Sequence, residues 1–212
     1  MNRPRYIAVE GVIGVGKTSL ANLLAERMDG RLVLENPEEN PFLDQFYKDS
    51  RHYAFQTQLF FLLSRFKQQQ SLPEPDLFHP LVVADYVFAK DRIFAYINLS
   101  EAEIALYEKV MGLLEVRVKK PDLVVYLQSS TERLMRNIRG RNRPYERDIS
   151  EEYLRTLNEA YNHFFFHYEE TPLLVVNATA IDYVGNLDHL EALIAEIDRD
   201  EIGTRYYNPV GQ

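Results

Sequence analysis

The sequence predicts an α/β fold of three layers, in which a parallel sheet of five strands is flanked by helices on both faces. Short apolar runs without polar alternation recur along the chain, and segments with helical periodicity separate them. Runs of this kind, rich in Val and Leu, are typical of parallel strands that are buried between two layers of helices. The expected strands are Tyr6–Val9, Leu32–Leu34, Leu81–Ala84, Leu123–Leu127 and Leu173–Val176.

The first expected strand leads into a glycine-rich segment that matches the phosphate-binding pattern G-x-x-x-x-G-K-[ST], and a helical periodicity follows it. Glycines let successive backbone N–H groups turn toward phosphate oxygens, and the N-terminus of the next helix adds positive potential. Lys17 supplies a point charge and Thr18 a hydroxyl for Mg²⁺. This loop therefore predicts nucleotide binding. The expected nucleotide-binding residues are Gly11, Val12, Ile13, Gly14, Val15, Gly16, Lys17, Thr18 and Ser19.

Composition limits the class of protein. A chain of 212 residues with 46% hydrophobic and 26% charged residues fits one folded domain, which we expect to span residues 1–212. The apolar runs are too short to cross a membrane and the first residues lead into a strand, so we expect neither a membrane span nor export. The chain has no cysteine, which favours a cytoplasmic location. A net charge of −8 argues against a nucleic-acid polymer as partner and favours small-molecule substrates.

Three helix starts carry the spacing of a capping box, in which a side chain at the cap and a Glu three residues later bond each other's backbone. The three pairs are Ser100 with Glu103, Ser129 with Glu132, and Asp148 with Glu151.

The segment from Tyr53 to Phe66, read as a helix, is apolar on nearly all sides. A helix that is apolar on two faces packs on two partners, so we expect a homodimer interface here, together with Ile104 to Leu114. The alternative is a helix that is fully buried within one chain.

Acidic residues follow two of the expected strands, Glu35 after the second and Asp85 at the end of the third. In a parallel α/β sheet, ligands bind beyond the carboxyl ends of the strands. Phosphoryl transfer requires an acid that holds Mg²⁺ near the loop hydroxyl and a carboxylate that accepts the proton of the acceptor. Glu35 and Asp85 are candidates for these two roles, and the alternative for each is a surface carboxylate at a strand end.

Six arginines lie between Arg133 and Arg147 of this acidic chain. The segment of about residues 136–147 reads as a helix end followed by a loop with Gly and Pro. We expect it to close over a triphosphate as an arginine-rich lid, with Arg139 and Arg143 among the binding residues. The alternative is a basic, solvated face of a helix.

Taken together, these motifs resemble the deoxynucleoside kinase family over nearly the whole chain, and most closely its bacterial deoxyadenosine/deoxyguanosine kinase branch. The resemblance implies a three-layer P-loop kinase fold with ATP as phosphoryl donor. Besides the phosphate loop, it is carried by L-E-N-P-E-E-N-P-F-L (34–43), A-F-Q-T-Q-L-F-F-L-L-S-R (54–65), D-Y-V-F-A-K-D-R-I-F-A (85–95), P-D-L-V-V-Y-L (121–127) and R-N-R-P-Y-E (141–146).

The resemblance also implies catalytic roles. Glu35 matches the base that takes the proton of the deoxyribose 5′-hydroxyl, while Lys17 and Arg141 match the cations that hold the transferring phosphoryl group. Thr18 and Asp85 look like the partners of Mg²⁺, with Asp85 close to the substrate as well.

For the substrate, the resemblance implies that Gln58 binds the nucleobase edge, with Arg65 on the same helix face and Asp91 opposite. The spacing of seven residues between Gln58 and Arg65 independently supports that shared face, whereas Gln56 points about 200° away from Gln58. Tyr47 and Glu146 match the pair that reads the 3′-hydroxyl.

One position departs from the family pattern. Many members follow the acid of the third strand with Arg-Ser, whereas Tyr86 and Val87 follow Asp85 here. We hypothesise that Lys90 or Arg92 supplies the missing charge, with the difference that a lysine acts as a point charge without a bidentate fork.

The sequence thus predicts an ATP- and Mg²⁺-dependent kinase that phosphorylates the 5′-hydroxyl of a deoxynucleoside, deoxyadenosine and/or deoxyguanosine, in nucleotide salvage. A nucleoside monophosphate kinase on a similar scaffold and a non-catalytic nucleotide-binding subunit are the alternatives. Nucleoside and nucleoside monophosphate offered separately with ATP distinguish the two enzymes.

Overall fold

A six-stranded parallel sheet forms the centre of the computed structural model, which describes residues 4–141, 143–179 and 181–209. The strand order is β2-β3-β1-β4-β5-β6, and every pairing is parallel. The strands are β1 (Tyr6–Gly11), β2 (Gly30–Val33), β3 (Leu81–Ala84), β4 (Leu123–Gln128), β5 (Leu173–Asn177) and β6 (Thr204–Tyr207).

The prediction of five strands is wrong because β6 extends the sheet beyond β5, with Val176 opposite Tyr207. The five expected strands are all present, although β2 begins at Gly30 instead of Leu32. Along β6 the residues alternate between exposed and half-buried. An edge strand of this kind lacks the continuous apolar run by which the buried strands were recognised.

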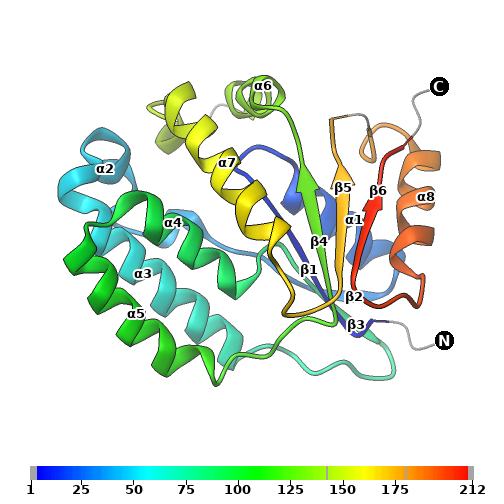
Figure 1. Ribbon diagram of the computed structural model, residues 1–212. Helices are drawn as coiled ribbons and strands as arrows, with labels where there is room; N and C mark the ends of the chain where they lie inside the picture. Colours follow the sequence, from blue (N-terminus) through cyan, green and yellow to red (C-terminus); the bar gives the residue numbers. More distant parts are fainter. Residues whose placement is uncertain (1–3, 142, 180, 210–212) are drawn as a thin grey trace.

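Helices cover both faces of the sheet (Figure 1), with α3, α4, α5 and α7 on one side and α1 and α8 on the other. Arg27 of α1 pairs with Glu191 of α8 at 2.6 Å, which joins the helices of the second side. The helices are α1 (Lys17–Arg27), α2 (Leu43–Lys48), α3 (Ser50–Gln70), α4 (Asp91–Asn98), α5 (Glu101–Glu115), α6 (Thr131–Arg141), α7 (Glu151–Phe166) and α8 (Leu187–Ile197). Short 3₁₀ turns cover Pro37–Glu39, Phe88–Lys90 and Pro144–Glu146.

The three predicted capping boxes have different outcomes. The box ahead of α5 is confirmed, with both of its hydrogen bonds present. The other two are wrong, because α6 begins directly after Ser130 instead of Ser129, and α7 is capped by Ser150 instead of Asp148. In both cases a serine closer to the helix accepts a backbone N–H and takes the role of the cap.

Helix α3 packs on α2, α4 and α5 around a second apolar core that includes the fully buried Leu62 and Met111. Its outer side and that of α5 keep apolar residues in solvent, with Leu63 47% and Leu113 73% exposed. The predicted helix is therefore partly buried within the chain and partly exposed, and the dimer stays a prediction. Across the described residues, none of the helices combines the length and the hydropathy that a membrane crossing requires.

Candidate active site

A cavity of about 490 Å³ opens beyond the carboxyl ends of β1, β2 and β3, between the phosphate loop, α3 and the segment that follows α6. Most of the residues predicted from the sequence line it. These are Ile13, Gly14, Gly16, Lys17, Thr18, Ser19, Glu35, Tyr47, Gln58, Arg65, Asp85, Arg141, Arg143 and Glu146. The other residues expected to bind nucleotide do not line this cavity: Gly11 ends β1, and Val12 and Val15 lie in the loop that follows.

The phosphate loop requires glycine at two positions where the backbone is left-handed. Gly14 has φ of 88°, and a Cβ there would lie 2.9 Å from the backbone oxygen of Leu134. Gly16 has φ of 108°, and a Cβ there would lie 2.4 Å from the hydroxyl of Tyr183. That hydroxyl donates to the backbone oxygen of Gly16 at 3.3 Å. The loop is thus packed against α6 and the chain before α8, which fixes its shape.

Lys17 and Thr18 extend from the end of this loop. The ammonium of Lys17 donates to the backbone oxygen of Gly11 at 2.7 Å, and burial lowers the pKa of Lys17 to about 8. Thr18 donates its hydroxyl to Asp85 Oδ2 at 2.7 Å, while Asp85 Oδ1 accepts the backbone N–H of Glu35 at 2.8 Å. A carboxylate and a hydroxyl oxygen therefore lie side by side at the mouth of the loop, which is a donor set that Mg²⁺ accepts.

Glu35 lies between two cations. Its Oε1 accepts from Arg65 Nε at 2.6 Å and its Oε2 accepts from Lys90 Nζ at 2.8 Å. Burial by itself raises the pKa of Glu35, but Arg65 and Lys90 together lower it to about 2. Glu35 is therefore ionised at neutral pH and keeps acceptor oxygens on the cavity.

Gln58 and Asp91 are coupled behind the cavity wall. Gln58 Nε2 donates to Asp91 Oδ1 at 2.7 Å and to the Asp91 backbone oxygen at 3.0 Å, and Arg65 donates to the same carboxylate. Asp91 is fully buried and does not line the cavity. In this arrangement it orients Gln58 and Arg65, which are the side chains that reach the cavity.

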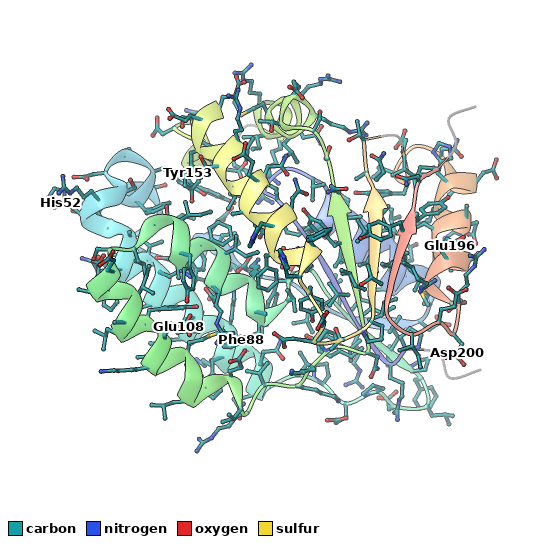
Figure 2. All side chains as sticks on the ribbon, in the orientation of Figure 1. His52, Phe88, Glu108, Tyr153, Glu196 and Asp200 are labelled. Atoms are coloured by element: carbon teal, nitrogen blue, oxygen red, sulfur yellow. The ribbon has the colours of Figure 1, made fainter. Side chains whose placement is uncertain are left out.

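The segment after α6 forms the far wall. Arg141 donates to both oxygens of Glu146, at 2.7 Å from Nε and 2.5 Å from Nη2. Tyr47 lies at the same end, where burial, with Tyr153 and Glu146 nearby, raises the pKa of Tyr47 well above its ordinary value. Figure 2 labels Tyr153 on the side of α7 toward α2.

Arg139, expected to bind nucleotide, lines a neighbouring cavity of about 260 Å³ that shares Arg143 and Glu146 with the larger one. Arg139 does not line the larger cavity. Asn142, inside the predicted lid, is outside the described residues.

The comparison with protein families decides the identity of this site. A family model described as deoxynucleoside kinase matches residues 7–202, which is nearly the whole chain. The chain belongs to the deoxynucleoside kinase family.

Relatives and solved structures agree with that assignment. The chain is 34% identical over 202 residues to the deoxyguanosine kinase of Bacillus subtilis (strain 168), covering 93% of this chain and 98% of that one. It is 27% identical over 198 residues to the deoxyadenosine/deoxycytidine kinase of the same organism, covering 90% of each. A structure of deoxyadenosine kinase from M. mycoides with bound dATP superposes with a TM-score of 0.79 at 27% identity, covering 92% of this chain and 100% of that chain.

As a deoxynucleoside kinase, the chain is an enzyme that phosphorylates deoxynucleosides, and the expected activity is confirmed. A nucleoside monophosphate kinase and a non-catalytic subunit, the two alternatives, are not supported by the family match.

The sequence departs from the deoxynucleoside kinase pattern after Asp85, and Lys90 and Arg92 are the two candidates for the missing charge. The structure distinguishes them. Tyr86 is fully buried, and the ammonium of Lys90 lies 5.6 Å from the centre of its ring and contacts Glu35. Arg92 faces away and pairs with Glu115 at 2.7 Å and with Glu108, which Figure 2 labels on α5. Of the two, only Lys90 reaches the cavity.

Sequence reasoning missed several lining residues of this deoxynucleoside kinase, among them Phe61, Phe94 and Tyr161. Aromatic residues at helical spacing are most often core, so the sequence held no signal to separate them. It also missed Glu10, which is fully buried beneath the phosphate loop. A charged residue between a buried strand and a phosphate loop was the signal available for Glu10.

Proposed function

We propose that the chain transfers the γ-phosphoryl group of ATP to the 5′-hydroxyl of a purine deoxynucleoside, in nucleotide salvage. The proposal is carried by one observation, the ionised carboxylate of Glu35 on the same cavity as Lys17 of the phosphate loop. Phosphoryl transfer needs positioning and charge stabilisation more than covalent chemistry, and this cavity offers both.

Glu35 accepts the proton of the attacking 5′-hydroxyl. A carboxylate with a pKa of about 2 is too weak a base to deprotonate a free hydroxyl. In a loose transition state the 5′-hydroxyl becomes acidic as its bond to phosphorus forms, and only then does Glu35 need to accept the proton. Arg65 and Lys90 hold both carboxylate oxygens in place until then. Lys90 and Arg92 were both candidates for the positive charge that the family pattern places after Asp85. We assign this role to Lys90.

On the donor side, the phosphate loop from Gly11 to Ser19 holds the triphosphate, and Lys17 and Arg141 hold the transferring group. The residues of about 136–147 close over it as the arginine-rich lid, with Arg143 on the cavity wall and Arg139 reaching it on closure. Guanidinium groups match phosphate oxygens in a bidentate manner.

Thr18 and Asp85 are the residues that would hold Mg²⁺ with the phosphates. Their adjacent hydroxyl and carboxylate oxygens fit its preference for a few protein oxygens completed by phosphate and water. When bound, Mg²⁺ supplies charge neutralisation at the phosphates.

On the acceptor side, Gln58 and Arg65 read the nucleobase and Asp91 orients them, while Tyr47 and Glu146 bind the 3′-hydroxyl. Because Gln58 Nε2 donates to two oxygens of Asp91, the side-chain oxygen of Gln58 remains to accept a donor of the base. The purine preference is supported by relatives named deoxyguanosine kinase and deoxyadenosine kinase, while the name of a third relative joins deoxyadenosine with deoxycytidine.

Initial rates with the four deoxynucleosides and labelled ATP test this assignment. We expect the purine deoxynucleosides to give at least about tenfold higher kcat/KM than thymidine and deoxycytidine. Preference for a pyrimidine would contradict the purine assignment and leave the kinase reaction intact.

We further propose one domain over residues 1–212, of which 1–3, 142, 180 and 210–212 lie outside the described residues, and a homodimer through α3 and α5. The dimer is supported by the exposed Leu63, Leu106 and Leu113 on these helices. The cytoplasmic location stays a prediction from composition.

A further inference from the structure

Glu10 is the buried acid that the proposed reaction leaves without a role. It lies near the end of β1, and its side chain is fully buried. Its Oε1 accepts the backbone N–H of Gly11 at 2.8 Å, and its Oε2 accepts the backbone N–H of Val87 at 2.9 Å. A buried carboxylate is costly unless its oxygens are bonded, and both oxygens of Glu10 are.

The two N–H groups belong to different halves of the site. Gly11 begins the phosphate loop, whereas Val87 precedes the turn that carries Lys90. The parallel pairing of β1 with β3 ends at Ala8 and Ala84. Beyond that pair, the Glu10 carboxylate joins the two strand ends where their backbones no longer pair.

The Glu10 carboxylate also lies close to Lys90, in the segment that follows Val87. Lys90 Nζ lies 3.9 Å from Glu10 Oε2 and 2.8 Å from Glu35 Oε2, so its ammonium lies between two carboxylates. Lys90 is 3% exposed, and burying an ammonium is costly unless carboxylates compensate its charge.

We propose that Glu10 is a positioning residue that keeps Lys90 in register with the phosphate loop by bridging the N–H groups of Gly11 and Val87. Glu10 does not line the cavity, so it acts through its neighbours and not on the substrates. Tyr161, which lines the cavity, also donates its hydroxyl to Glu10 Oε1 at 3.3 Å. The inference rests on the proposed role of Lys90 beside Glu35.

A double-mutant cycle with Glu10→Gln and Lys90→Met tests the proposal. Glu10→Gln keeps the size of the side chain but puts an amide donor where one oxygen accepted an N–H. We expect each single variant to lower kcat at least about tenfold, with KM for both substrates within about threefold in Glu10→Gln. The double variant should lie within about threefold of Lys90→Met alone, because Glu10 acts through that lysine.

Tyr126→Phe is the matched control. Tyr126 lies opposite Glu10 in the next strand, is fully buried, and donates to Asn162 at 2.9 Å. The variant loses a buried hydrogen bond at the same level of the sheet, and the lost hydroxyl bonds to Asn162 and not to Glu10. Its kcat should stay within about threefold of wild type. If Glu10→Gln does not fold, Glu10→Asp repeats the cycle, since it keeps the charge but is too short to reach both N–H groups.

The outcomes separate the inference from the function on which it rests. Two results would overturn the positioning role of Glu10 and leave the role of Lys90 standing. One is a double variant in which the losses of kcat multiply. The other is a Glu10 variant as active as wild type when Lys90→Met is impaired. A fully active Lys90→Met would overturn both. Wild-type activity in the same assay tests the kinase reaction itself.

Discussion

Replacing Glu35 by Gln perturbs the centre of the proposed site with little change in shape. In the wild type, the carboxylate accepts from Arg65 at 2.6 Å and from Lys90 at 2.8 Å. The amide carries no charge and offers one acceptor oxygen instead of two. Glu35→Gln therefore removes the proton acceptor and leaves two buried cations without their shared counterion.

The expected loss of activity follows from the role of a general base. Such groups contribute about 10² to 10⁴ in rate, so kcat should fall at least about a hundredfold. Affinity for ATP should change by less than about threefold, because Glu35 belongs to the acceptor side of the cavity.

The expected loss of stability follows from the pKa. Lowering the pKa of Glu35 from 4.5 to about 2 corresponds to about 3 kcal/mol of stabilisation by the charged form. Because the folded-state pKa is the lower one, this contribution is present above about pH 4.5 and is lost as the pH falls toward 2. The free energy of unfolding of the wild type should therefore exceed that of Glu35→Gln by about 3 kcal/mol at pH 7, and this difference should be smaller at pH 3.

Steady-state kinetics, ATP-analogue binding and urea unfolding at both pH values measure these effects. A variant with wild-type kcat would refute the base role and make Asp85 the next candidate. A stability difference that is equal at pH 7 and pH 3 would refute the electrostatic account of Glu35.

Two further outcomes are expected. Lys90→Met should lower kcat at least about tenfold in steady-state assays while Arg92→Met stays within about threefold, and equal losses would refute the separation of the two cations. Leu113→Glu, on the exposed face of α5, should convert a dimer into a monomer in light scattering, while the loop variant Leu77→Glu, at a position 92% exposed, should not. A wild type that is already monomeric at micromolar concentration would contradict the dimer.

Much of the fold was predictable because buried parallel strands leave continuous apolar runs, as in the first five residues of the strand Leu123–Gln128. The strand Thr204–Tyr207 lies at the sheet edge, where alternate residues stay exposed, and so left no such run. The phosphate loop and the acids at strand ends were predictable because the topology brings them to one edge of the sheet.

Other parts of the site depend on side-chain direction, which a sequence does not disclose. Lys90 and Arg92 are two residues apart, yet one contacts Glu35 and the other pairs with α5. Asp91 lies behind Gln58, and Glu10 bridges two backbone groups that are far apart in the chain. Each follows from packing between segments that no local pattern specifies.

Product analysis tests the central claim most directly. Wild-type enzyme, Mg²⁺, ATP and deoxyguanosine or deoxyadenosine are combined, and the phosphorylated position is identified by phosphorus NMR. We predict the 5′-monophosphate, formed with one ADP per product. Phosphorylation at the 3′-hydroxyl, or no product from any of the four deoxynucleosides, would contradict it.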